Sequence, residues 1–213
     1  MEESIQEKEM KYYSLIDKVY SEKNLLKAYG RVESNRGAPG IDGVTVEMFA
    51  EKLPEEIERL SGEIKRGEYK PMSLRRVEIP KADGKTRQLR IPAVRDRVVQ
   101  QSLKEVLEPI FEEGFHPSSY GYRKGRNAWQ AVEKAKAFAS KYGLCNVVEL
   151  DLSECFDTLD HEKIIDSVAE RVSDGKILKL IRTILKSGVM EDGVWKATET
   201  GSPQGGRNKP TAG

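Results

Sequence analysis

Two short segments of alternating polar and apolar residues constrain the fold of this chain most strongly. The segments 74–80 and 86–92 flank the sequence Ala82-Asp83-Gly84-Lys85. Alternation on both sides of an Asp-Gly pair is typical of a β-hairpin with a tight turn. Residues 189–200 repeat this pattern around Asp192-Gly193. We therefore expect two hairpins.

Most of the remaining sequence shows apolar residues at helical spacing. A first helix is expected from Ser4 to Gly30, with a break near Ser21. A second is expected after Thr45, with a kink at Pro54. Further helices are expected at 94–113, 127–142, 161–171 and 176–186. Helices together with hairpins predict the α+β class, with mainly antiparallel strands.

The composition argues against a membrane protein and against a disulfide-rich or zinc-binding one. Charged residues make up 33% of the 213 residues, and no apolar run approaches the ~20 residues that a bilayer-spanning helix needs. The polar, acidic first ten residues do not fit a secretion signal. Cys145 and Cys155 are too few for a disulfide framework, and His116 and His161 lack partners at metal-site spacing. We expect a soluble, intracellular protein in which neither histidine is catalytic.

Charge is segregated along the chain, although the net charge is only +1. Residues 1–60 carry −4, residues 61–145 carry +8 and residues 146–213 carry −3. A basic segment suits a nucleic-acid backbone, and an acidic one suits divalent metal ions. A solvated surface that happens to be basic gives the same pattern, so charge alone does not decide between them.

The segment 146–152 is short, mostly apolar and contains a carboxylate near its end, at Asp151. It predicts a buried strand whose end projects this side chain into a cleft. Mg²⁺ prefers oxygen ligands and is usually held by one or two carboxylates together with substrate phosphates. Asp151 is therefore a candidate metal ligand; the alternative is that it only caps the turn after the strand.

Two further segments have residues suited to binding a nucleotide. Lys81, Lys85, Arg87 and Arg90 cluster on or beside the first hairpin turn, where their charges can converge on one anion. The alternative is a solvated strand edge, where lysine is common. The segment Gly201-Ser202-Pro203-Gln204-Gly205-Gly206 lets a ligand approach the backbone closely, although a plain turn has the same composition.

Taken in this order, these segments resemble the reverse transcriptases of bacterial mobile group II introns. The resemblance covers about residues 20–206. The loop 35–43 looks like the one that those proteins carry ahead of the polymerase core. The motifs that follow the hairpin and its helix are Tyr120-Gly121-Tyr122-Arg123, Asp151-x-x-x-x-Phe156-Asp157 and the Gly-Ser-Pro-Gln-Gly-Gly segment.

The resemblance implies a right-hand polymerase fold, with an N-terminal extension and fingers in residues 1–145 and the first half of the palm in residues 146–213. It implies copying of RNA into DNA by a two-Mg²⁺ mechanism in the bacterial cytoplasm. The implied partners are an RNA template or intron RNA, a DNA primer and dNTPs. Asp151 matches the catalytic, metal-binding aspartate, and the Leu152 carbonyl would help to hold the second ion beside the nucleotide.

The resemblance also assigns residues to the incoming nucleotide. Lys81 and Arg87 match the residues of the fingers that grip the triphosphate. Phe156 matches the bulky residue that excludes a 2′ hydroxyl, so that deoxynucleotides are preferred. Gln204 matches the glutamine beside the 3′ position of the nucleotide.

This sequence departs from the family pattern after Gly206. The Tyr/Phe-x-Asp-Asp motif that supplies the paired carboxylates is missing, and one carboxylate cannot organise two Mg²⁺ ions. We expect that this chain alone binds RNA but does not polymerise. A non-catalytic RNA-binding maturase module is thus the alternative function. A retron or defence-type reverse transcriptase is a further alternative, against which the loop 35–43 argues.

A palm sheet cut in this way exposes strand edges and apolar surface. We therefore expect the chain to self-associate, by exchange of its terminal hairpin between copies. Light scattering at high protein concentration measures this directly, and a monodisperse monomer would contradict the expectation.

Overall fold

The computed structural model describes residues 11–80, 86–152, 155–191, 194–198 and 200–201. The chain divides into two compact units. Unit 1 comprises Met1–Val106 together with Glu154–Gly213, and unit 2 is the inserted segment Leu107–Ser153. No helix in these described ranges is long and apolar enough to span a membrane.

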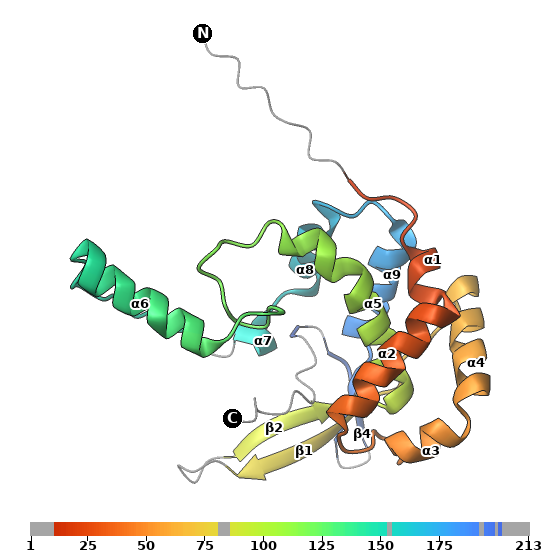
Figure 1. Ribbon diagram of the computed structural model, residues 1–213. Helices are drawn as coiled ribbons and strands as arrows, with labels where there is room; N and C mark the ends of the chain where they lie inside the picture. The colour runs from red at the N-terminus through yellow and green to blue at the C-terminus, as the bar shows by residue number, and fades with distance from the viewer. Residues whose placement is uncertain (1–10, 81–85, 153–154, 192–193, 199, 202–213) are drawn as a thin grey trace. The chain divides into compact units, whose positions relative to one another are not determined.

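In the described part of unit 1, both expected hairpins are confirmed and together form one four-stranded sheet (Figure 1). Strand β1 (Leu74–Pro80) pairs antiparallel with β2 (Thr86–Ile91). Strand β3 (Val189–Glu191) pairs antiparallel with β4 (Val194–Lys196). A parallel pairing of β1 with β3 joins the hairpins in the order β2-β1-β3-β4, and no local sequence signal indicated this contact.

The first two described helices correct one sequence expectation. The break at Ser21 is confirmed: α1 (Ile16–Tyr20) ends there, and the Ser21 side chain caps α2 (Glu22–Asn35) by accepting a backbone N–H. However, α2 does not end at Gly30. The apolar period continues beyond this glycine and buries Val32, so the gain from packing outweighs the modest cost of a glycine inside a helix.

The expected helix after Thr45 is divided into two. The Thr45 side chain caps α3 (Val46–Glu51) by accepting a backbone N–H at 3.2 Å. The chain leaves helical geometry at Lys52, and α4 (Leu53–Arg66) then starts with Pro54 in its first turn. Proline is tolerated there because its missing N–H has no partner inside the helix, so the expected kink is a new helix start.

Helix α5 (Val94–Glu112) begins in unit 1 and supports the N-terminal helices with a buried hydroxyl. The Ser102 hydroxyl donates to the carbonyl of Val19 at 2.6 Å and accepts from Asn24 Nδ2 at 2.7 Å. Apolar side chains from several helices fill the core around it. Fully buried members include Leu25, Leu60, Val98 and Ile177.

Asp174 connects α9 (Gly175–Leu185) to the N-terminal end of the chain. One carboxylate oxygen caps α9, and the other accepts two N–H groups at the start of α1. The four donors are the backbone N–H groups of Leu15, Ile16, Lys176 and Ile177, at 2.6, 2.9, 2.9 and 3.3 Å. Two segments about 160 residues apart are thereby held by one side chain.

Asp96 has a similar role ahead of the sheet. It is 1% exposed and accepts the Tyr69 hydroxyl at 2.7 Å and the Met72 N–H at 2.9 Å. Burial raises the pKa of the Asp96 carboxyl, and these two hydrogen bonds oppose the rise. Burial and the nearby carboxylate also raise the pKa of Tyr69 well above its usual value. The contacts fix the chain as it approaches β1.

Unit 2 contains the end of α5, a loop and α6 (Ala128–Tyr142). The expected helix at 127–142 is confirmed, and Asn127 and Gln130 form a reciprocal capping box at the start of α6. The loop is fastened by Arg123, whose guanidinium contacts Glu112 at 2.7 Å. None of the residues of α6 is buried.

The expected strand at 146–152 is wrong. These residues form no strand, and their apolar side chains face solvent: Val147 and Leu150 are each 90% exposed. A strand requires a neighbour that completes its backbone hydrogen bonds, and no described strand pairs with this segment. The apolar composition was typical of a buried strand, but it did not show which partner would cover it.

Candidate functional site

Three segments that lie far apart in the sequence meet in unit 1. They are strand β2, the short helix α7 (Cys155–Thr158) with the start of α8 (His161–Ala169), and residues 200–201. We call this meeting point the junction. It consists of Arg90, Asp157, Leu159, His161, Thr200 and Gly201.

Asp157 lies at the centre of the junction and contacts two of the three segments through different groups. Its carboxylate Oδ1 lies 3.3 Å from Nη1 of Arg90 on β2. Its backbone carbonyl accepts the hydroxyl of Thr200 at 3.2 Å. Because the ion pair is partly exposed, it contributes only about 0.5 kcal/mol to the stability of the fold. Its main consequence is to set the orientation of α7 against the hairpin.

Gly201 is buried and held on three sides. Its N–H donates to the Leu159 carbonyl at 2.8 Å, and its own carbonyl lies 2.8 Å from Nε2 of His161. Its φ of +87° belongs to the left-handed region. A Cβ added here would lie 2.9 Å from the carbonyl oxygen of Asp157 and 3.1 Å from that of Phe156, so the junction requires glycine.

Asp160 sets where α8 begins. Its carboxylate accepts the N–H groups of Glu162 and Lys163 at 2.8 and 3.0 Å. These hydrogen bonds, from Lys163 and Glu162, lower the pKa of the Asp160 carboxyl. A charged cap at this position makes His161 the first residue of the helix and places its ring beside Gly201.

The structure places Arg90, one of the four basic residues on or beside the first hairpin turn, in the junction, and it places Phe156 next to the junction. Phe156 lies on α7 and is 41% exposed, with its carbonyl beside Gly201. The backbone of Arg87 lies in β2 opposite Ile79, and its side chain is outside the described residues. Lys81 and Gln204 also lie outside the described residues.

Asp151 and Leu152 are found in unit 2, in the exposed extended segment that follows α6. Leu152 is 77% exposed. Within the described ranges, no three His, Cys, Asp or Glu side chains gather closely enough to hold a metal ion. Asp151 is chemically suited to Mg²⁺, but the described residues do not by themselves form the two-ion site that the resemblance implies. We therefore assign no metal-dependent step to them.

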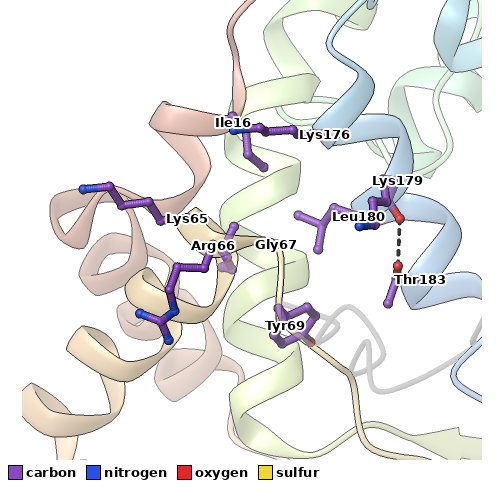
Figure 2. Close-up of a pocket in the computed structure, with 10 residues that line it drawn as sticks. Ile16, Lys65, Arg66, Gly67, Tyr69, Lys176, Lys179, Leu180 and Thr183 are labelled. Carbon is purple, nitrogen blue, oxygen red and sulfur yellow. Dashed lines mark hydrogen bonds between the residues drawn. The ribbon is translucent and has the colours of Figure 1, made fainter.

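A separate pocket lies in unit 1 between the start of α1, the end of α4 and α9 (Figure 2). Ile16 and Leu180 point into it, and the ring of Tyr69 lies at one side. Lys65 and Arg66 line it, but Figure 2 shows that their charged ends point away from its centre. The charged ends of these two residues therefore do not converge on the centre of the pocket.

Comparison with known families identifies the class of protein. Residues 79–212, more than half of the chain, match the family described as "Reverse transcriptase (RNA-dependent DNA polymerase)". The chain belongs to the reverse transcriptase family. The matched span includes β2, α7 and Gly201, and therefore every residue of the junction.

Similar proteins place this reverse transcriptase with the group II intron type. "Protein YkfC" of Escherichia coli K12 is 40% identical over 182 residues, which cover 83% of this chain and 48% of YkfC. "Group II intron-encoded protein LtrA" of Lactococcus lactis subsp. cremoris is 34% identical over 187 residues, or 86% of this chain and 30% of LtrA. "Nuclear intron maturase 1, mitochondrial" of Arabidopsis thaliana is 35% identical over 96 residues. The chain thus spans about half or less of these relatives.

Two features of the junction in this reverse transcriptase were not predicted from the sequence. His161 was expected to have no special role, yet it is buried against Gly201. The Arg90–Asp157 pair joins residues more than sixty positions apart. A helix cap at Asp160 followed by a histidine was the only local signal near either feature, and it does not indicate what the histidine contacts.

Proposed function

We propose that this chain is the nucleotide-gripping and RNA-binding part of a group II intron RNA-directed DNA polymerase, with fingers in residues 1–145 and the first half of the palm in residues 146–213. The observation that carries the proposal is the junction. It joins the basic hairpin, Phe156-Asp157 and the first residue of the glycine-rich segment in one compact unit.

The roles of the individual residues form part of this proposal. Lys81 and Arg87 hold the triphosphate of a dNTP, because guanidinium and ammonium groups match phosphate oxygens in charge and hydrogen bonding. Phe156 lies against the sugar and excludes a 2′ hydroxyl. Gln204 lies beside the 3′ position. The exposure of Phe156 on α7 supports a ligand contact, since a core phenylalanine would be covered.

Asp151 and the Leu152 carbonyl are the proposed Mg²⁺ ligands of this chain. When bound, Mg²⁺ would neutralise phosphate charge and position the primer hydroxyl in the two-ion nucleotidyl transfer of the parent polymerase. Among the described residues, no three His, Cys, Asp or Glu side chains gather closely enough to complete such a site. The proposal therefore assigns binding, but not nucleotidyl transfer, to this chain by itself.

The alternative is a binding module that supports intron splicing without polymerisation, and the similarity to "Nuclear intron maturase 1, mitochondrial" favours it. The basic segment 61–145, with its +8 charge, supports RNA binding under either proposal. The two functions differ in whether the chain also recognises a dNTP.

A binding titration and a primer-extension assay distinguish these functions. We expect the chain to bind structured RNA with an affinity that falls steeply with salt, by roughly 0.7–0.9 log units per log unit of salt for each phosphate contacted. We expect it also to bind a fluorescent dNTP with Mg²⁺, and not to extend a primer on an RNA template. RNA binding without dNTP binding would support the binding module.

The matched controls are two variants that each remove two positive charges from unit 1. Lys81→Ala with Arg87→Ala is expected to weaken dNTP binding by about tenfold or more. Lys176→Ala with Lys179→Ala removes exposed charges on α9 and is expected to leave dNTP binding within about twofold. Equal losses in both variants would contradict the assigned roles. Primer extension that Asp151→Ala abolishes would show that a complete catalytic site is present.

A further inference from the structure

His161 has an unusual combination of burial and hydrogen bonding for a residue at the start of a surface helix. It is 3% exposed, and its Nε2 lies 2.8 Å from the carbonyl oxygen of Gly201, forty residues later in the chain. A carbonyl oxygen can only accept, so Nε2 carries the proton in this contact.

Packing alone does not account for a histidine at this position. Nδ1 is buried and has no hydrogen-bond partner among the described residues. A buried polar atom without a partner disfavours the folded state, whereas an apolar side chain of similar size would fill the same space without that cost. The feature that only the histidine supplies is the N–H donated to Gly201.

The carbonyl of Gly201 is held by His161. The amide of Gly201 is fixed by Leu159, and its Cα lies so close to the Phe156 and Asp157 carbonyls of α7 that a Cβ would not fit. The remaining freedom of Gly201 is rotation of its carbonyl about the Cα–C bond. The hydrogen bond from His161 restricts that rotation and so keeps Gly201 against α7.

We infer that His161 is a positioning residue that fixes the Gly201 carbonyl and thereby holds Gly201 against the carbonyls of Phe156 and Asp157 on α7. His161 does not touch the nucleotide. It acts through Gly201 on α7, whose Phe156 lies against the nucleotide in the proposed function, so this inference rests on the proposed function.

The test compares two amides that differ by one methylene. In His161→Gln the side-chain N–H₂ reaches about as far as Nε2 does, so the bond to Gly201 is retained. In His161→Asn the same group falls short, and the bond is lost. Ile165→Val is the control, because it loosens packing on the same helix at a buried position without altering the contact to Gly201.

Two quantities are measured on the full chain: hydrogen exchange at the Gly201 amide, and the affinity for a fluorescent dNTP with Mg²⁺. For His161→Asn we expect about fivefold faster exchange and about fivefold weaker dNTP binding, the effect of losing one hydrogen bond. His161→Gln is expected to restore both to within about twofold. Ile165→Val is expected to leave dNTP affinity unchanged.

The outcomes separate this inference from the proposed function. If the unaltered chain binds no dNTP, the proposed function fails, and the exchange rates of the Gln and Asn variants still decide whether His161 fixes Gly201. Equal behaviour of the Gln and Asn variants would overturn the positioning role. So would a loss of dNTP affinity in Ile165→Val as large as that in His161→Asn, because a general loosening of α8 would then explain both.

Discussion

Replacing Asp174 by alanine is expected to lower the free energy of unfolding of the chain by about 3 kcal/mol. The Asp174 carboxylate is 8% exposed and accepts four backbone N–H groups, two at the start of α1 and two at the start of α9. In the alanine variant all four N–H groups lose this acceptor. Those that are buried cannot form a replacement hydrogen bond with water. Urea denaturation followed by circular dichroism measures the loss.

The matched control is Asp160→Ala on α8, which removes an exposed cap with only two N–H donors. It is expected to destabilise the chain less than Asp174→Ala does. Comparable losses for the two variants would show that the bonds from Asp174 to α1 add nothing to an ordinary helix cap.

The contribution of Asp174 also has a defined pH dependence. Burial by itself raises the pKa of this carboxyl, but the four N–H donors outweigh burial, and the folded pKa lies below the usual value. Its stabilising effect is therefore fully present above the unfolded pKa of about 3.9 and is lost as the pH falls through the lower, folded pKa. The stability difference between the unaltered chain and Asp174→Ala should shrink correspondingly below about pH 4.

Gly201→Ala is expected to detach residues 200–201 from the junction, at a local cost of about 2 kcal/mol. The left-handed φ of +87° disfavours any side chain, and the new Cβ would meet the Asp157 carbonyl at 2.9 Å. Hydrogen exchange at residue 201 should rise by about thirtyfold, and dNTP affinity should fall by tenfold or more. Global unfolding in urea should change little, because the buried apolar residues of the described ranges all precede this position.

Gly43→Ala provides the comparison for conformational cost alone. Gly43 is also in unit 1 and has a φ of +70°, but a Cβ there would meet nothing within 4 Å. Its replacement should leave dNTP affinity unaltered. If Gly201→Ala behaved in the same way, the close approach to Asp157 would have no functional consequence.

Features with a local cause were predictable from the sequence. The alternation around Asp83-Gly84 identified the first hairpin, and the hydroxyl of Thr45 identified a helix start, because both signals act over a few residues. Gly30 was misread as a stop because a propensity of this size yields to tertiary packing. The segment 146–152 was predicted to be a buried strand but is exposed. Its apolar composition gave no information about which strand would pair with it.

Long-range contacts explain why the site was only partly predictable. The order of the motifs that contain Arg87, Asp151 and Phe156 indicated the family, which the match over residues 79–212 confirms, whereas the roles of these three residues stay predictions. No periodicity or composition of the sequence indicates the hydrogen bond from His161 to Gly201. A contact between segments forty residues apart depends on the fold of both, and a single sequence does not contain that information locally.

The parallel pairing of β1 with β3 has a consequence for synthesis of the protein on the ribosome. The two strands are separated by more than a hundred residues, and all of unit 2 is made between them. At translation rates of about 5–20 residues per second, the edge of β1 that pairs with β3 stays unpaired for roughly 5–20 s. During that interval the nascent hairpin presents an open edge to other chains, so faster elongation should reduce misassembly and pausing within unit 2 should increase it.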